Sequence, residues 1–172
     1  MKDYELCSTL VVKSQMKLGK TKTLGKYLET HFPSKNQLVP PVIRMITFRQ
    51  TFSLNMLKSF PNFSLYSKIT KEINTIHYPR VIIQTESLYR LKYSIEPIDL
   101  LILDEVESIL DQFNSGLFKY FNASFTMFQW MMKTAKYVIC MDANVCDRTY
   151  YILRKFLIQF WPICHRQYHT HM

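Results

Sequence analysis

An eight-residue segment, Ser14 to Thr21, combines the residue types that bind the phosphates of a nucleotide. It ends in Gly19-Lys20-Thr21, follows an apolar run and precedes a stretch with helical spacing. Backbone N–H groups at a helix start attract phosphate, and Gly19 lets the backbone approach closely. Lys20 would reach the β- and γ-phosphates, and the Thr21 hydroxyl would bind Mg²⁺. The segment therefore predicts a phosphate-binding loop, or P-loop, with ATP and Mg²⁺ as cofactors.

Two positions of this loop differ from the general P-loop pattern. Ser14 stands where the first glycine is usual, and Lys17 stands where a glycine is common two residues before Gly19. We expect Lys17 to crowd the β-phosphate and so weaken ATP binding, because an exposed charge contributes under about 1 kcal/mol in compensation. The alternative is a lysine-rich helix start without a ligand. The predicted cofactor-binding residues are Ser14, Lys17, Gly19, Lys20 and Thr21.

Two adjacent carboxylates, Asp104 and Glu105, follow the most apolar run of the chain, residues 100–103. Ligands of parallel sheets bind beyond the carboxyl ends of the strands. A metal-bridged nucleotide needs one carboxylate near Mg²⁺, and its hydrolysis needs another group to orient and deprotonate water. Asp104 and Glu105 are therefore the predicted catalytic residues. The alternative is an ordinary helix start, where acidic residues are favoured.

Apolar runs alternate with stretches of helical spacing along the chain, and this alternation would position both motifs. The predicted strands are one ending at 10–12, then 42–48, 80–84, 99–103 and 137–141. The predicted helices are 20–31, 50–60, 87–93, 107–113, 116–136 and 147–158. Continuous apolar strands separated by helices predict an α/β fold. We expect a three-layer sandwich, with about five mainly parallel strands and helices on both faces of the sheet.

Length and composition suit one compact domain with an apolar core. Of the 172 residues, 48% are apolar and 20% are charged. The formal net charge of +9 favours a polyanionic partner such as nucleic acid, and the alternative is a solvated basic surface. No apolar run approaches the roughly 20 residues that cross a bilayer, so no membrane partner is expected. Asp3 and Glu5 make a poor signal peptide, and four cysteines are too few for a disulfide scaffold. We expect an intracellular protein with reduced thiols that is not secreted.

The segments around the two motifs resemble the helicase domain of herpesvirus-type replication origin-binding proteins, within the superfamily 2 helicases. Residues 12–21 are similar to motif I of that family, and residues 46–52 are similar to motif Ia. Residues 84–91 contain a Glu-Ser-Leu core that is similar to a family segment, and residues 99–113 are the closest match. Residues 135–149 resemble motif III and the helix after it. The resemblance covers about residues 8 to 157, in order.

The resemblance implies a P-loop NTPase domain with a RecA-like fold over residues 1–157. It also implies ATP hydrolysis coupled to DNA unwinding and a role in initiating DNA replication, in the nucleus or at a viral or replicon replication site. Within the acidic pair, it implies that Asp104 binds the metal ion and that Glu105 acts on water. Residues 158–172 fit no element and are predicted to form an irregular tail.

The resemblance also implies residues that contact nucleic acid and a residue that couples two domains. Motif Ia and the Glu-Ser-Leu segment would touch the nucleic-acid backbone, with Arg49, Thr51 and Ser87 as donors to phosphate. A surface loop and a helix cap are the alternatives for these residues. Asp142 would couple the nucleotide state to a second domain, and its alternative role is the N-cap of the last helix.

Such a second RecA-like domain normally supplies arginine fingers and half of the ATP cleft, and the chain ends where that domain would start. We therefore expect weak activity from this chain alone, because an arginine finger contributes roughly 10³ to 10⁵ in rate. A second chain that supplies the missing domain is a candidate partner. The alternatives are a catalytically incompetent relic that binds nucleic acid or a partner, and a P-loop kinase. For a kinase, we find no lid segment with arginines.

Two further groups of residues have less specific patterns. Cys164, His165, His169 and His171 match no standard zinc spacing, so an irregular tail is the favoured interpretation. Aromatic residues recur at helical spacing over one segment, where core packing is favoured over base stacking. These aromatics are Phe118, Tyr120, Phe121, Phe125, Phe128 and Trp130.

Overall fold

The structure is a computed structural model of the whole chain, and it describes most of the residues. The described ranges are 9–15, 18–34, 38–70, 72–91, 98–115 and 118–157. Lys17, the predicted tail at 158–172 and its Cys164-His165 group lie outside the described residues. Residues 92, 93, 116, 117 and 158, which end or begin predicted helices, also lie outside them.

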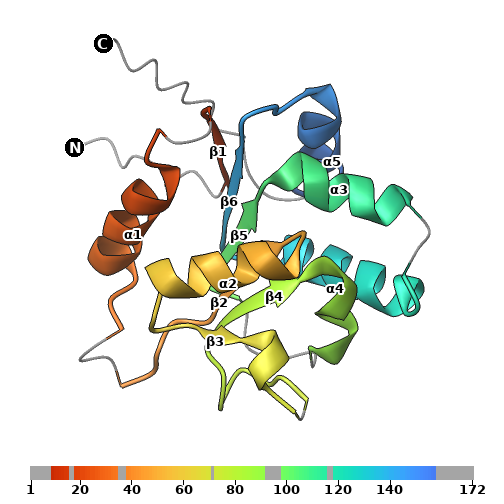
Figure 1. Cartoon of the computed structure of the whole chain (residues 1–172). Coiled ribbons are helices and arrows are strands. Elements are labelled where there is room, and N and C mark those ends of the chain that lie inside the picture. The colour runs from red at the N-terminus through yellow and green to blue at the C-terminus, as the bar shows by residue number, and fades with distance from the viewer. Residues whose placement is uncertain are drawn as a thin grey trace.

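The described residues form one sheet of six strands, all parallel (Figure 1). The strands are β1 (Thr9–Lys13), β2 (Ile43–Thr47), β3 (Ser64–Leu65), β4 (Arg80–Gln84), β5 (Leu100–Asp104) and β6 (Tyr137–Asp142). Their order across the sheet is β1-β6-β5-β2-β4-β3. All five predicted strands are present. The prediction missed β3, because two residues are too few to show a hydrophobic period.

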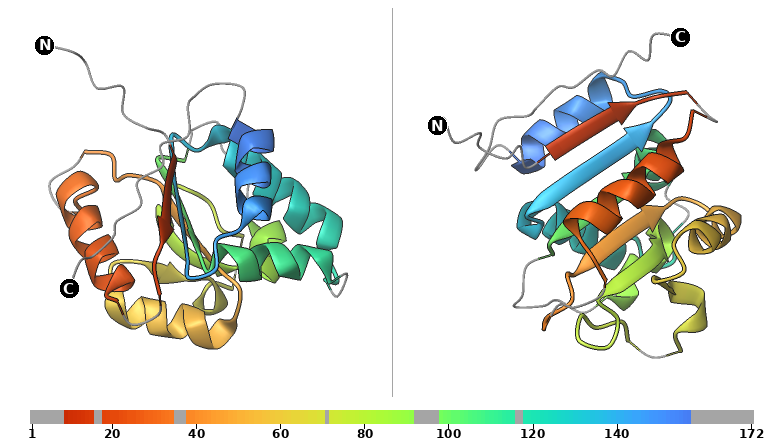
Figure 2. Two further views of the ribbon diagram at one scale, coloured as in Figure 1. Left: turned by 90° about the horizontal axis from the view of Figure 1, so that it is seen from above. Right: turned by 90° about the vertical axis from the view of Figure 1, so that its left-hand side faces the viewer.

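Helices cover both faces of the sheet, as the three-layer prediction required (Figure 2). The α-helices are α1 (Lys20–His31), α2 (Gln50–Ser59), α3 (Val106–Asn114), α4 (Phe121–Thr134) and α5 (Asp147–Leu157). Crossovers between parallel strands are right-handed. The steps from β1 to β2 and from β2 to β3 therefore place α1 and α2 on one face. The return step from β5 to β6 places α3 and α4 on the other face, where α5 contacts both.

Two predicted helices differ from the observed elements. The segment predicted as a helix from Ser87 is a 3₁₀ helix, η2 (Thr85–Arg90), which begins directly where β4 ends. The long helix predicted from residue 116 begins at Phe121, because the chain still turns at residues 118–120. Phe118 packs there against Phe113, with ring centroids 5.6 Å apart. A second short 3₁₀ helix, η1 (Tyr66–Lys68), follows β3.

The core lies on both faces of the central strands. Every residue of β2 and of β5 is buried, as expected for strands covered on both sides. The predicted aromatic packing is confirmed for an edge-to-face and stacked cluster between α3 and α4. Its members are Phe113, Phe118, Phe121, Phe125 and Phe128. Trp130 packs partly buried against the core, whereas Tyr120 is 45% exposed.

Two of the four cysteines lie within the described residues, and neither forms a disulfide there. Cys140 in β6 is a buried free thiol, and its burial raises the pKa to about 12. Cys146 is free and exposed. Among the described residues, no helix is long and apolar enough to cross a membrane.

Candidate nucleotide site

The P-loop and the acidic pair meet at the carboxyl ends of β1 and β5. The register pairs Lys13 with Asp142 and Asp104 with Met141, so the ends of β1, β6 and β5 are level. Strand β6 lies between the other two. Two strand spacings therefore separate the ends of β1 and β5 by roughly 10 Å, which leaves room for phosphates and a metal ion between them.

Gly19 begins helix α1 in a left-handed conformation, with φ of 80° and ψ of 17°. A Cβ atom added at this position would meet no atom of the described residues within 4 Å, so the backbone conformation favours glycine here. Helix α1 has no side-chain cap and no acidic residue in its first turn. The N–H groups of that turn have no partner within the helix, so its positive end is suited to an anion.

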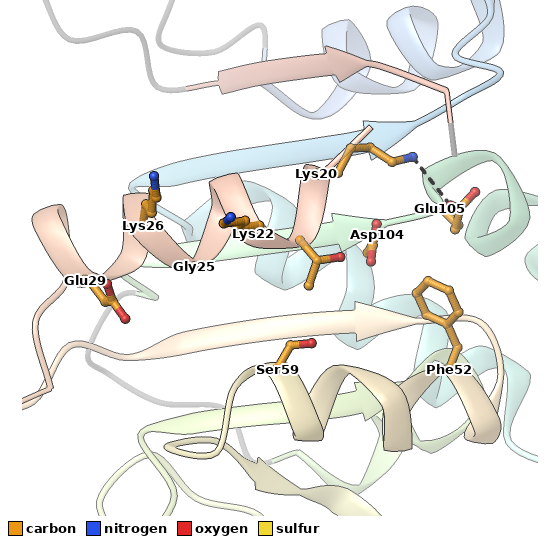
Figure 3. Close-up of a pocket in the computed structure, with 11 residues that line it drawn as sticks. Lys20, Lys22, Gly25, Lys26, Glu29, Phe52, Ser59, Asp104 and Glu105 are labelled. Atoms are coloured by element: carbon orange, nitrogen blue, oxygen red, sulfur yellow. Dashed lines mark ion pairs between the residues drawn. The ribbon is translucent and has the colours of Figure 1, made fainter. Parts of the chain in front are cut away.

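The Lys20 ammonium lies against Glu105 at this helix start (Figure 3). Its Nζ is 3.6 Å from Glu105 Oε1, and the two side chains are 11% and 12% exposed. Despite this burial, Nζ has no hydrogen-bond partner in the described part of the chain. An ammonium donates three hydrogen bonds, and leaving them unmade in a buried place is costly. The site therefore fits phosphate oxygens that would accept from Lys20.

Asp104 ends β5 almost completely buried, at 2% exposure. Burial and the neighbouring Glu105 raise the pKa of Asp104 to about 7, and Asp142 adds to the rise. The Lys20 ammonium and the Glu105 backbone N–H lower the pKa without offsetting the rise. A buried carboxylate near other carboxylates gains most from a bound cation, so Asp104 fits the predicted role of Mg²⁺ ligand.

Glu105 has the left-handed backbone conformation that non-glycine residues rarely adopt, with φ of 59° and ψ of 58°. It occupies the N-cap position of α3, but its side chain makes no cap hydrogen bond. Its backbone N–H instead donates to the Met141 carbonyl at 2.9 Å. This turn directs the carboxylate toward Lys20, as Figure 3 shows, and the catalytic role of the acidic pair stays a prediction. Backbone strain of this kind is common where a site must hold one side chain in place.

Five of the predicted P-loop and acidic residues line one cleft of about 720 Å³, which extends between α1 and α2 (Figure 3). The lining residues are Gly19, Lys20, Thr21, Lys22, Gly25, Lys26, Glu29, Phe52, Ser59, Asp104 and Glu105. Ser14 does not line the cleft, and its N–H donates to the Asp142 carbonyl at 3.0 Å. The sequence did not indicate Phe52 and Ser59, because only the packing of α2 on α1 brings them to the cleft.

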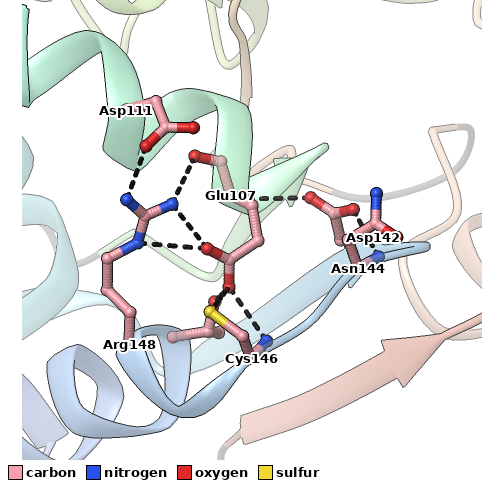
Figure 4. Close-up of polar contacts among 7 residues, drawn as sticks. Glu107, Asp111, Asp142, Asn144, Cys146 and Arg148 are labelled. Carbon is pink, nitrogen blue, oxygen red and sulfur yellow. Dashed lines mark hydrogen bonds and ion pairs between the residues drawn. The ribbon is translucent and has the colours of Figure 1, made fainter.

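Asp142 holds the start of α3 rather than the last helix (Figure 4). Its Oδ2 accepts from the Glu107 N–H at 2.9 Å, and its Oδ1 accepts from the Asn144 N–H at 2.8 Å. The alternative role as N-cap of the last helix is therefore wrong, since α5 begins only at Asp147. The coupling role of Asp142 stays a prediction, and its contacts connect β6 to the helix that follows the acidic pair.

The Glu107 side chain in turn connects α3 to the start of α5 (Figure 4). Its carboxylate accepts from the Cys146 N–H at 3.1 Å and from the Thr149 hydroxyl. It also forms an ion pair with Arg148, with Nη2 2.6 Å from Oε2. Burial alone would raise the pKa of Glu107, but the Thr149 and Arg148 hydrogen bonds outweigh it and lower the pKa. No sequence motif indicates this network, because its members are about 40 residues apart in the sequence.

The three predicted phosphate donors lie at neighbouring strand ends. Arg49 and Thr51 are exposed at the start of α2, which follows β2, and Ser87 is half-buried in η2, which follows β4. Strands β2 and β4 are neighbours in the sheet, and the Thr85 hydroxyl donates to the Thr47 carbonyl at 3.1 Å. The three residues are thus at the same edge of the sheet as the candidate nucleotide cleft.

Comparison with known proteins identifies the family of the chain and viral proteins that are similar to it. Residues 5–156 match the model of the family described as "Origin of replication binding protein". A protein of African swine fever virus (isolate Warthog/Namibia/Wart80/1980), named "Putative helicase/primase complex protein", is 55% identical over 156 residues, which are 91% of this chain and 15% of the relative. The "Replication origin-binding protein" of human herpesvirus 6B (strain Z29) is 34% identical over 140 residues, 78% of this chain and 16% of the relative. The chain thus spans about a sixth of the length of these relatives.

Two solved structures share the fold. A structure of S. cerevisiae Dbp5 bound to Nup159, Gle1, IP6 and ADP has a TM-score of 0.60 and 14% identity, covering 89% of this chain and 42% of that one. The Sulfolobus solfataricus SWI2/SNF2 ATPase core in complex with dsDNA has a TM-score of 0.50 and 17% identity, covering 79% of this chain and 28% of that one. At these identities the likeness establishes the RecA-like fold of helicase domains and nothing finer.

Proposed function

The chain belongs to the origin of replication binding protein family, and from that premise we propose that it is the ATP-binding first domain of a helicase-like replication motor. It binds Mg²⁺ and ATP in the cleft at the ends of β1 and β5, and DNA at the neighbouring strand ends. The observation that carries the proposal is the buried Lys20 ammonium, which has no hydrogen-bond partner among the described residues and faces the acidic pair.

Each residue of the cleft has a distinct role in this proposal. Lys20 and the first-turn N–H groups of α1 bind the phosphates, and Gly19 keeps the backbone in the left-handed conformation that this turn needs. The Thr21 hydroxyl and Asp104 hold Mg²⁺, which supplies charge neutralisation on the transferred phosphoryl group. Glu105 orients the attacking water and accepts its proton.

A complete motor needs a second RecA-like domain, because arginine fingers normally come from it. We propose that such a domain, in the same polypeptide or in another chain, closes the cleft and supplies them. The family premise and the DNA complex of a protein with the same fold support DNA as the partner. The basic net charge of +9 supports it on electrostatic grounds. We propose that the protein acts where DNA replication begins.

A titration of the chain with a fluorescent ATP analogue, with and without Mg²⁺, tests the nucleotide site. Lys20→Ala should lower the affinity about 10- to 150-fold, because a hydrogen bond to a charged group is worth roughly 1.5 to 3 kcal/mol. Lys133→Ala removes an exposed lysine of α4 and is the matched control, which should bind as the native chain does. Equal affinities for all three proteins would overturn the phosphate site and leave the relic that only binds nucleic acid or a partner.

The same titration tests the crowding expected from Lys17. We expect Lys17→Gly to raise the affinity, because glycine removes the side chain near the β-phosphate and frees the backbone. A lower affinity of Lys17→Gly would mean that this lysine binds phosphate instead. Hydrolysis by these 172 residues alone should be slow in every case, because arginine fingers normally come from a second RecA-like domain.

A further inference from the structure

Two exposed tyrosines contact each other, ring against tilted ring, next to the strand ends assigned to the nucleic-acid backbone. Tyr89 belongs to η2 and is 41% exposed, and Tyr120 immediately precedes α4 and is 45% exposed. Their ring centroids are 4.3 Å apart and the planes are inclined by 39°. The phenylalanine rings at the start of α4 are buried in the core or pack against it partly buried, whereas this pair is exposed.

The pair is held in position by the contact between η2 and α4. The Ser124 hydroxyl of α4 is buried, accepts from the Tyr89 N–H at 3.3 Å and donates to the Glu86 carbonyl at 3.4 Å. The two elements form the most extensive helix-to-helix contact among the described residues. Tyrosines on such a support lose little conformational entropy when a further ring stacks on them.

The charges around the pair suit a polyanion. The Lys119 ammonium lies 5.4 Å from the centre of the Tyr120 ring and its side chain is exposed, so it can turn to a phosphate. Ser87 lies two residues before Tyr89 in the same 3₁₀ helix, and Arg49 lies at the neighbouring strand end. Glu86 is the exposed acidic group of η2, and its carboxylate would have to face away from a bound polyanion.

We propose that Tyr89, Tyr120 and Lys119 form a stacking platform for single-stranded DNA. A base of the strand stacks on the exposed ring surface of the tyrosine pair, and the Lys119 ammonium contacts the adjacent phosphate. The partner is a single strand, because the bases of a duplex are already paired and stacked on each other. The inference rests on the proposed DNA-binding function, and it adds a base contact to the backbone contacts of Arg49, Thr51 and Ser87.

Fluorescence anisotropy of the full chain with a labelled single strand of about 16 nucleotides tests the platform. Tyr89→Leu with Tyr120→Leu removes the rings and keeps apolar volume. It should weaken binding at least about fivefold, because base stacking on an aromatic ring contributes roughly 1 to 3 kcal/mol. Tyr89→Phe with Tyr120→Phe keeps the rings and should bind as the native chain does. Tyr151→Leu is the matched control, because this tyrosine is 65% exposed on α5, which follows β6 and not β4.

A second probe needs no variant. A strand with abasic sites keeps the phosphates but lacks bases, so the native chain should bind it at least about fivefold more weakly. The leucine variant should bind normal and abasic strands alike. Equal binding of both strands by the native chain, or an equal loss of duplex and single-strand binding in the leucine variant, would overturn the platform and leave DNA binding intact. Failure of the native chain to bind any DNA at low salt would overturn the proposed function as well.

Discussion

The buried carboxylate of Asp104 suits a metal ligand, but its negative charge lowers the stability of the folded protein. Its burial and the nearby Glu105 and Asp142 carboxylates raise its pKa to about 7, while Lys20 only partly compensates. In the unfolded chain the same carboxyl titrates near pH 3.9. Between about pH 4 and pH 7 the folded protein therefore retains a proton that the unfolded chain has lost, and stability falls as the pH rises through this window.

We predict that Asp104→Asn stabilises the chain at pH 8 in the absence of Mg²⁺. The substitution removes a buried negative charge, and the gain should be on the order of 1 to 4 kcal/mol in the free energy of unfolding. The gain should shrink to a small fraction by pH 4, where the folded carboxyl is protonated and the unfolded one is about half protonated. Urea unfolding at the two pH values measures it. A native chain that is more stable than Asp104→Asn at pH 8 would show that Lys20 outweighs the burial of the carboxylate.

At the scale of elements, hydrogen bonds of Asp142 and Glu107 join α3 to β6 and to the start of α5. We call this set of contacts the interlock. Asp142 on β6 accepts from the backbone of α3 at Glu107, and the Glu107 carboxylate accepts from the start of α5 at Cys146 and Thr149. The Asp142 carboxylate thus binds the start of α3, and the Glu107 carboxylate of α3 binds the segment after β6. This arrangement holds the strained turn at Glu105 against β6.

We predict that Glu107→Gln costs about 2 to 4 kcal/mol of stability at pH 7, because it leaves Arg148 without its buried partner. The pKa of Glu107 is lowered in the folded protein, so its contribution is present above pH 4 to 5 and is lost as the pH falls through the folded pKa. Thermal unfolding at pH 7 and at pH 3 measures both effects.

Asp111→Asn is the matched control for this interlock. Asp111 also pairs with Arg148, but its side chain is 67% exposed, so its loss should cost under about 1 kcal/mol. A double-mutant cycle of Glu107→Gln with Arg148→Ala should give a coupling of roughly 1 to 3 kcal/mol. Equal costs for the Glu107 and Asp111 variants would argue against the interlock as the stabilising contact.

Net charge acts at the scale of the whole molecule. With 22 Lys and Arg against 13 Asp and Glu, the surface favours an extended polyanion. We predict that DNA binding is largely independent of sequence and that its affinity falls steeply with salt, by a slope in log units of about 0.9 per duplex phosphate contacted. Binding isotherms at 50 and 200 mM salt measure the slope. Binding that does not change with salt would argue against a backbone-dominated interface.

Much of the fold followed from the sequence, because its signals are local. The apolar runs predicted five strands and their alternation with helices, since burial on both faces requires continuous apolar residues. The Gly19-Lys20-Thr21 motif and the Asp104-Glu105 pair followed from residue types and their places after strands. Helix α1 and strand β4 have the predicted bounds. Strand β3 did not follow, because its two residues have no period and, within the described ranges, pair with β4 alone.

Only the tertiary structure decided which distant residues meet. Strand order placed β6 between β1 and β5, and this spacing brings Lys20 to 3.6 Å from Glu105. The packing of separate segments made Asp142 the partner of α3, buried Glu107 beside Arg148, and left Tyr89 and Tyr120 in contact on the surface. Sequence periodicity reports which face of an element is buried. It carries no information about which other element covers that face, because that choice depends on contacts summed over the whole chain.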